Sequence, residues 1–168
     1  INNSINLITV GRLSPEKGYL RIIENLSQLK KFNFIYKIVG QGHHKSEINK
    51  LLESKKLLDK VVFLEQTNEI LYHLNKSDLF LQGSYVEGFP NAVLDSCIVG
   101  TPVLAYNVPG GTKEIIKHGF NGFLVKNDNE FRKNLNDFFE KKNINFDMKK
   151  ISLDIRKRFG QKIILDSY

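Results

Sequence analysis

Cysteine is nearly absent from this chain of 168 residues, which contains only Cys97. One cysteine cannot close a disulfide within the chain, so we expect a cytoplasmic protein rather than a small disulfide-stabilised secreted domain. No apolar run approaches the roughly 20 residues that a transmembrane helix needs. No signal peptide opens the chain, and it begins at Ile1 without a methionine. We therefore expect an excised piece of a longer protein.

Metal-binding and nucleophilic patterns are also missing. His73 and His118 have no cysteine, aspartate or glutamate at ligand spacing, so we predict no metal site. His43 and His44 are adjacent and would point about 100° apart on a helix, so we expect both on the surface. Ser84 has no partnered histidine in any recognisable pattern, and a hydrolase triad is therefore unsupported.

Acidic residues are outnumbered: 18 Asp and Glu face 25 Lys and Arg, for a formal net charge of +7. Such a balance favours nucleic acid, an anionic membrane or a phosphorylated ligand. The sequence shows no nucleic-acid-binding module and no set of stacking aromatics, so we expect no nucleic-acid partner. Basic residues are concentrated in the tail, at Lys149, Lys150, Arg156, Lys157 and Arg158. They form either a solvated basic face or a surface attracted to an anionic membrane.

The composition, with 41% hydrophobic and 26% charged residues, is that of a soluble globular protein with a real core. Short apolar runs alternate with amphipathic segments along the chain. This alternation predicts βαβ units, and hence an α/β fold: a Rossmann-like, doubly wound parallel sheet of about six strands with helices on both faces. We expect residues 1–168 to form one such domain.

Ligands of such a sheet bind at the carboxyl ends of its strands. The loops that begin at Gly11, Gly40, Glu87 and Pro109 all follow predicted strands. We therefore expect these four loops to lie together on the ligand-binding edge.

The stretch of residues 87–100 reads E-G-F-P-N-A-V-L-D-S-C-I-V-G and lies between two predicted strands. Pro90 suits the first turn of a helix, because its missing N–H would be unpaired there anyway. The helix start would offer free N–H groups near Asn91, Ala92 and Val93, together with the positive end of the helix dipole. These features favour an anion such as phosphate.

Two carboxylates flank this helix start, Glu87 just before it and Asp95 about two turns into it. Carboxylates accept hydrogen bonds from hydroxyl groups and repel phosphate, so the stretch is expected to hold a phosphate with sugars on either side. Gly88 lacks a Cβ atom, which permits a tight turn or the close approach of a ligand.

Arg12 and Lys17 lie in the first strand–helix loop, on the same predicted edge. Two cations there would neutralise a diphosphate and stabilise a leaving nucleotide as its negative charge develops. Taken alone, an arginine and a lysine in a loop are more often simply solvated. Their position beside the Glu87 stretch favours the functional interpretation.

The string E-G-F-P-N-x-x-L-D, together with G-R-x-x-x-x-K-G at residues 11–18, resembles the retaining glycosyltransferases of family 4. That family has the GT-B fold and carries an acidic pair spaced E-x7-E in its C-terminal domain. The resemblance extends from about residue 7 to residue 125. It implies that Glu87 binds the transferred sugar, that the backbone of residues 88–93 meets the sugar and the diphosphate, and that Asp95 binds the ribose. Asp95 is one methylene shorter than the family's second glutamate.

Carried over residue by residue, the resemblance also implies that Gly42 borders the nucleotide pocket and that Gly110, Gly111 and Glu114 match a G-G-x-x-E element beside it. We expect a close approach of ligand or backbone at the two glycines, whereas Glu114 is equally well explained as an acid favoured by the dipole at a helix start. The expected catalytic residues are Arg12, Lys17 and Glu87. The expected substrate-binding residues are Gly11, Gly42, Gly88, Phe89, Pro90, Asn91, Ala92, Val93 and Asp95.

The resemblance implies the C-terminal, donor-binding half of a GT-B enzyme that uses a nucleotide diphosphate sugar, first of all a UDP-sugar. The reaction would be retaining transfer of a hexose or N-acetylhexosamine to a glycan or lipid-linked acceptor, as in surface polysaccharide synthesis. Arg12, Lys17 and the helix start would hold the diphosphate, so no metal and no cofactor are expected. The acceptor would bind an N-terminal domain absent from this chain, and we expect the domain alone to be inactive. We expect a cytoplasmic location, with peripheral contact at the inner face of the membrane as an option.

Two alternatives remain open. One is another enzyme of the same architecture, such as a nucleotide-sugar 2-epimerase, which a product assay on the longer protein would distinguish. The other is a non-catalytic sugar-nucleotide-binding domain, which the shorter acid at Asp95 leaves open.

Overall fold

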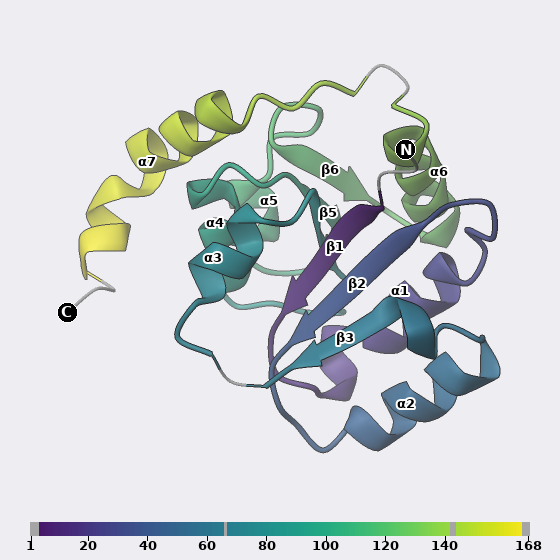
Figure 1. The fold of residues 1–168 in the computed structure, drawn as a ribbon. Coiled ribbons are helices and arrows are strands. Elements are labelled where there is room, and N and C mark those ends of the chain that lie inside the picture. The colour runs from purple at the N-terminus through teal and green to yellow at the C-terminus, as the bar shows by residue number, and fades with distance from the viewer. Residues whose placement is uncertain (1–3, 66, 142–143, 166–168) are drawn as a thin grey trace.

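The computed structural model describes residues 4–65, 67–141 and 144–165, with side chains as far as residue 160. Six strands form one sheet in which every neighbouring pair is parallel, in the order β3-β2-β1-β4-β5-β6 (Figure 1). The prediction of a doubly wound parallel sheet of about six strands is confirmed. The strands are β1 Ile5–Val10, β2 Phe34–Val39, β3 Val61–Leu64, β4 Leu79–Gln82, β5 Val103–Tyr106 and β6 Gly122–Val125.

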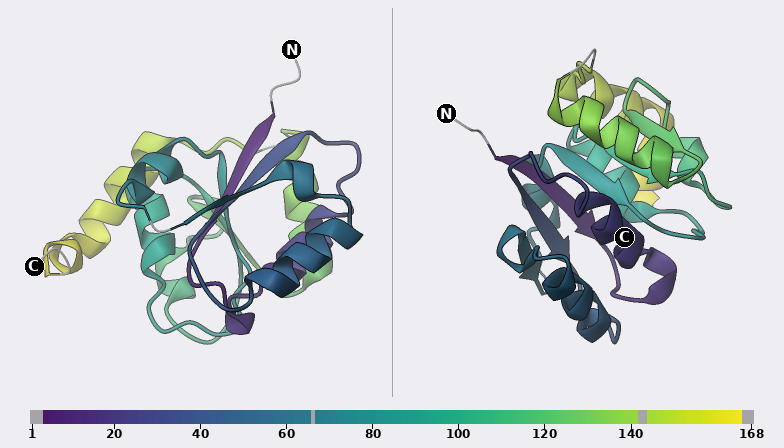
Figure 2. Two further views of the ribbon diagram at one scale, coloured as in Figure 1. Left: turned by 60° about the horizontal axis from the view of Figure 1, so that its bottom comes forward. Right: turned by 90° about the vertical axis from the view of Figure 1, so that its right-hand side faces the viewer.

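Helices cover both faces of the sheet, and Figure 2 shows the layers from two further sides. One face is covered by α1 Tyr19–Leu26, α2 Lys45–Ser54 and α6 Asp128–Phe139. The other is covered by α3 Ile70–Asn75, α4 Asn91–Ile98, α5 Thr112–Ile115 and α7 Met148–Leu165. Two single 3₁₀ turns, η1 Pro15–Lys17 and η2 Leu58–Lys60, precede α1 and β3.

Strand β1 shows why the sequence forms this architecture. Its consecutive residues Leu7 and Ile8 are both fully buried, although side chains alternate across a strand. Leu7 packs in the core that contains Ile22 of α1, and Ile8 packs in the core that contains Val93 of α4. A continuous apolar run is therefore what a central parallel strand with helices on both faces requires.

The strand order reverses between β1 and β4, the two middle strands. From β1 the chain winds outward through β2 to β3, then crosses back so that β4 pairs with the other side of β1, with Leu7 opposite Leu79 and Ile8 opposite Phe80. The loops after β1 and β4 therefore diverge and leave a crevice at the carboxyl ends of these two strands. Such a reversal is where open α/β sheets bind their ligands.

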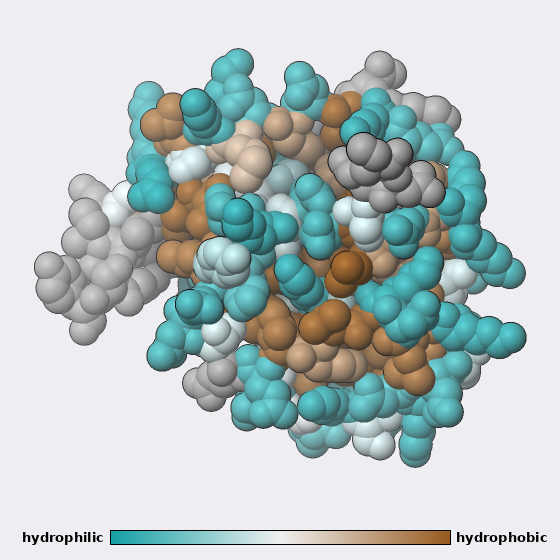
Figure 3. Space-filling view, viewed as in Figure 1, coloured by the Kyte–Doolittle hydropathy of each residue, from teal (hydrophilic) through white to brown (hydrophobic). Residues whose placement is uncertain are grey.

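Apolar side chains reach the surface over β2 and β3, where Ile35 and Val62 are 38% and 43% exposed (Figure 3). Ile35 lies opposite Asn6, near the start of β1 and away from the carboxyl end of that strand. None of the helices in the described part of the chain is long and apolar enough to cross a membrane.

Candidate functional site

A cavity of about 220 Å³ opens at the strand-order reversal, between the loop after β1 and the loop that joins β4 to α4. Its walls come from segments far apart in the sequence, as the predicted shared edge requires. It is lined by Thr9, Val10, Gly11, Arg12, Lys17, Tyr19, Phe80, Gln82, Gly83, Ser84, Glu87, Phe89, Pro90, Asn91, Ala92 and Val93.

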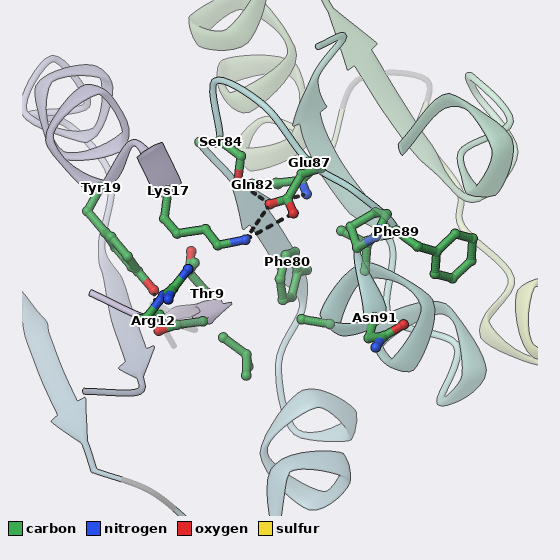
Figure 4. Close-up of a pocket in the computed structure, with 16 residues that line it drawn as sticks. Thr9, Arg12, Lys17, Tyr19, Phe80, Gln82, Ser84, Glu87, Phe89 and Asn91 are labelled. Atoms are coloured by element: carbon green, nitrogen blue, oxygen red, sulfur yellow. Dashed lines mark hydrogen bonds and ion pairs between the residues drawn. The ribbon is translucent and has the colours of Figure 1, made fainter. Parts of the chain in front are cut away.

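Glu87 is the most heavily bonded side chain of this cavity, and this side chain is only 8% exposed. The ammonium of Lys17 donates to Oε1 at 2.8 Å and to Oε2 at 2.9 Å (Figure 4). The amide of Gln82 and the hydroxyl of Ser84 both donate to Oε1. Among the described residues, Oε1 thus accepts from three donors, and Oε2 accepts from Lys17 alone. A carboxylate oxygen offers about two lone pairs, so Oε2 keeps acceptor capacity for a ligand hydroxyl.

The orientation of the Gln82 side chain is itself fixed by a hydrogen bond. The hydroxyl of Thr112, which is fully buried, donates to the Gln82 side-chain oxygen at 3.3 Å. Because that oxygen is the acceptor, the amide nitrogen of Gln82 faces Glu87, to which it donates at 3.3 Å. Thr112, Gln82 and Glu87 therefore form a polar chain that leads from the start of α5 into the cavity.

The backbone of Glu87 is held by the Pro109–Gly111 loop after β5. The Glu87 N–H donates to the Pro109 carbonyl at 3.0 Å, and the Gly111 N–H donates to the Gly88 carbonyl at 2.7 Å. Gly110 has φ +118°, and a Cβ atom there would lie 1.6 Å from the Glu87 carbonyl oxygen. Only glycine fits this position. The close backbone approach expected of the glycine pair is confirmed.

Arg21 of α1 fixes the loop between β4 and Glu87. Its guanidinium donates to the carbonyls of Gly83 and Ser84 and lies over the rings of Tyr85 and Tyr106, at 4.0 Å and 3.5 Å from their centroids. Cation–π contacts and charge-assisted hydrogen bonds of this kind are individually modest but directional. The segment that carries Ser84 and Glu87 is therefore anchored to the helix that follows Lys17.

Arg12 lines the cavity with a side chain that is 73% exposed, and it contacts Glu16 at 3.3 Å. Its guanidinium is thus available to an anion at the mouth of the cavity. Tyr19, which is buried, donates its hydroxyl to the Gly11 carbonyl at 2.8 Å. Burial, and secondarily the negative charge of Glu87, raise the pKa of Tyr19 well above its usual value.

The start of α4 differs from the expectation of free N–H groups at Asn91, Ala92 and Val93. The chain makes two tight turns there: the Asn91 N–H donates to the Phe89 carbonyl at 3.0 Å, and the Val93 N–H donates to the Pro90 carbonyl at 3.0 Å. Two of the three donors are therefore engaged, and the expectation is wrong for them. The Ala92 N–H has no backbone partner in the described part of the chain, and it lies at the positive end of the helix.

The remaining predicted residues lie at or behind the cavity wall. Phe89 turns its ring away from Glu87 and toward Phe159 of α7, with ring centroids 6.0 Å apart (Figure 4). Gly42 supports the wall from outside, because a Cβ atom there would lie 2.1 Å from the Leu13 carbonyl oxygen. Asp95 is half-buried in the second turn of α4, beyond the lining residues.

Nine of the twelve predicted site residues line the cavity, and Gly42, Gly88 and Asp95 do not. Sequence patterns alone missed Gln82, Ser84, Thr112 and Arg21. Among residues 4–65, 67–141 and 144–165, no group of three or more His, Cys, Asp and Glu side chains is placed to hold a metal ion.

A family model described as "Glycosyl transferases group 1" matches residues 2–155. Among curated relatives, an uncharacterized glycosyltransferase of Haemophilus influenzae is 30% identical over 125 residues, which are 73% of this chain and 35% of that protein. A UDP-Gal:alpha-D-GlcNAc-diphosphoundecaprenol alpha-1,3-galactosyltransferase of Escherichia coli is 31% identical over 129 residues, 74% of this chain and 33% of that protein. The chain thus spans about a third of the length of these curated relatives.

Among solved structures, Anabaena HepE in complex with UDP and glucose shares the fold, with a TM-score of 0.85 and 24% sequence identity. The match covers 99% of this chain and 49% of the HepE chain.

Proposed function

The chain belongs to the group 1 glycosyl transferases, and on that premise we propose that residues 1–168 are the C-terminal, donor-binding domain of a retaining GT-B enzyme of family 4. The donor is a UDP-sugar that carries a hexose or N-acetylhexosamine. The acceptor is a glycan or a lipid-linked glycan of surface polysaccharide synthesis, and it binds a further domain of the longer protein.

The observation that carries this proposal is the pairing of Lys17 with Glu87 inside the cavity. A cation suited to a leaving diphosphate lies in contact with a carboxylate suited to sugar hydroxyls. A sugar diphosphate presents these two groups side by side. A plain nucleotide site has no need of the carboxylate, and a plain sugar site has no need of the cations.

In the proposed complex the diphosphate lies between Arg12, Lys17 and the Ala92 N–H, at the positive end of α4. Breakage of the bond between the sugar and the diphosphate oxygen leaves an added negative charge on that oxygen. Fixed cations and a helix end stabilise this charge without reorganisation. The acceptor hydroxyl attacks from the same face and passes its proton to the leaving diphosphate, so retention needs no enzyme nucleophile.

Glu87 holds the sugar in this scheme. Its Oε1 is filled by neighbouring donors, whereas Oε2 accepts from Lys17 alone among the described residues, and a sugar hydroxyl donates there. Asp95 binds the ribose hydroxyls from the second turn of α4, and the Gly42 turn borders the nucleotide beyond Leu13. Both roles require the donor to extend along the loop edge, away from Glu87.

The names of the comparison proteins support the choice of UDP and of the acceptor class. The Escherichia coli relative is named for UDP-galactose and for an acceptor on diphosphoundecaprenol, and HepE was solved with UDP and glucose. Because the chain spans a third of such relatives, we expect no transfer by this domain alone.

Calorimetric titration of the chain with UDP, GDP and ADP, without added metal, tests the proposal. We expect UDP to bind most tightly and Arg12→Ala to weaken UDP about tenfold, as loss of a charge-assisted hydrogen bond predicts. Arg156→Ala removes an exposed guanidinium from α7 and is the matched control, with unchanged UDP affinity. Absence of binding by all three diphosphates, both here and in the longer protein, would contradict the proposal.

A further inference from the structure

Helix α7, Met148–Leu165, carries four exposed cations on one face. These cations are Lys149, Lys150, Arg156 and Lys157, and Leu153 between them is 69% exposed. At 100° per residue these five positions fall within an arc of about 120°. The face is therefore one continuous stripe, and this α7 basic face is defined by these five residues.

The opposite side of α7 fixes the orientation of the stripe. Ile151 and Ile155 are fully buried in the core shared with α4. Ser152 donates its hydroxyl to the Ile98 carbonyl at 2.6 Å, and Arg158 donates to the carbonyls of Glu114 and Ile115, each at 2.8 Å. The α7 basic face consequently points away from the domain, and Figures 1 and 2 show that α7 itself lies at one edge of the molecule.

Few acidic groups neutralise this face. Asp154 lies at its margin and is held by Lys117 and Arg158, neither of which belongs to the face. Asp147 approaches Lys150 at 3.8 Å, with both side chains at least half exposed. Lys149 and Lys157 make no ion pair within the part of the chain that the structure describes.

We propose that the α7 basic face docks on an anionic phospholipid surface. Four cations on one side of a helix suit lipid phosphates, and each contributes through short-range attraction to the headgroups. Leu153 projects from the centre of the stripe, where it reaches the boundary between headgroups and acyl chains. The exposed leucine at the centre of the stripe supplies the apolar contact that such docking uses, and protein interfaces are depleted in lysine.

The position of α7 adds a consequence for the site. Phe159, in the last part of the helix whose side chains are described, contacts Phe89 of the cavity loop. A bilayer beneath α7 would therefore lie close to the donor-binding turn, within reach of a lipid-linked acceptor. This consequence rests on the proposed function, whereas the docking itself does not.

Sedimentation of the chain with vesicles tests the proposal. One set of vesicles is phosphatidylcholine alone, and the other contains equal parts of phosphatidylcholine and phosphatidylglycerol. We expect binding only to the anionic vesicles, and its loss at about 1 M salt, where the Debye length is about 3 Å. The double variant Lys149→Gln/Lys157→Gln is expected to lower partitioning onto the anionic vesicles roughly thirty-fold. Leu153→Ser is expected to lower it several-fold.

The matched control is Lys30→Gln/Lys50→Gln, which removes the same charge from exposed positions before β2 and on α2. It is expected to change partitioning only slightly. Equal binding to neutral vesicles, an equal loss in the control, or no binding at all would overturn the proposal. So would binding of random single-stranded RNA through Lys149 and Lys157 while anionic vesicles are ignored. UDP titration of the α7 double variant, expected to match the unmodified chain, keeps this test separate from that of the proposed function.

Discussion

The ammonium nitrogen of Lys17 lies 2.8 Å and 2.9 Å from the two carboxylate oxygens of Glu87, a residue 70 positions further along the chain. An ammonium has three N–H donors, and the two oxygens of one carboxylate engage at most two of them. The third remains for a phosphate oxygen. Lys17 can therefore bind a diphosphate while it still holds Glu87, so the cation and the carboxylate act on adjacent parts of one donor.

Replacement of Lys17 by alanine is expected to weaken UDP binding. A hydrogen bond to a charged group contributes about 1.5–3 kcal/mol, which corresponds to a ten- to hundredfold loss of affinity. Lys113→Ala, at an exposed position on α5, is the control and is expected to leave UDP affinity unchanged. Calorimetric titration measures both. Equal affinity of Lys17→Ala and the unmodified chain would show that Lys17 serves only Glu87.

Thr112 is expected to influence the sugar and not the nucleotide, because it acts through Gln82 on Glu87. Thr112→Val keeps the shape and removes the hydroxyl, which frees the Gln82 amide to turn. We expect UDP-glucose to lose several-fold in affinity while UDP does not change. Thr112→Ser retains the hydroxyl and is expected to restore UDP-glucose affinity. A similar loss in the serine and valine variants would assign Thr112 to packing alone.

Two glycines near Glu87 are expected to respond differently to alanine. Gly110→Ala places a Cβ atom 1.6 Å from the Glu87 carbonyl oxygen at a positive φ, so the free energy of unfolding is expected to fall by about 1–3 kcal/mol. A Cβ atom at Gly88 would meet nothing within 4 Å, and the φ of Gly88 is not positive. Gly88→Ala is therefore expected to change the free energy of unfolding by less than about 0.5 kcal/mol. Thermal unfolding of the two variants checks the pair, and a larger loss for Gly88→Ala would contradict this account of the loop.

Alkaline pH is expected to destabilise the domain through Tyr19. Burial raises the pKa of Tyr19 in the folded chain, so its stabilising effect is fully present below the unfolded value of about 10. Above that pH the unfolded chain releases the proton and the folded chain keeps it, so stability falls by up to about 1.4 kcal/mol per pH unit. Urea unfolding at increasing pH measures the slope. Tyr19→Phe is expected to make it shallower, and an unchanged slope would remove Tyr19 as a cause.

The alternation of strands and helices, and the gathering of loops on one edge, follow from local periodicity and could be predicted from the sequence. The polar contacts behind Glu87 could not, because they join distant positions: Thr112 and Gln82 are 30 residues apart, and Arg21 and Ser84 are 63 apart. No local pattern encodes such pairs.

The burial of His44 is a second feature that local sequence patterns did not predict. The sequence predicts a surface position for it beside His43, and this prediction is wrong, because His44 is only 5% exposed. Its backbone N–H donates to the Leu13 carbonyl at 3.1 Å, so the turn after β2 folds against the loop after β1 and covers the ring. The two engaged N–H groups at the start of α4 likewise depend on turns at Phe89 and Pro90 that helix periodicity does not specify.

The most direct test of the donor site compares UDP-glucose with UDP in the unmodified chain and in Glu87→Gln. If Glu87 binds the sugar, the unmodified chain will hold UDP-glucose more tightly than UDP, and Glu87→Gln will lose most of that difference while it still binds UDP. Titration with UDP-N-acetylglucosamine extends the comparison to the other sugar class. A Glu87→Gln variant that retains the whole preference for the sugar conjugate would contradict the account.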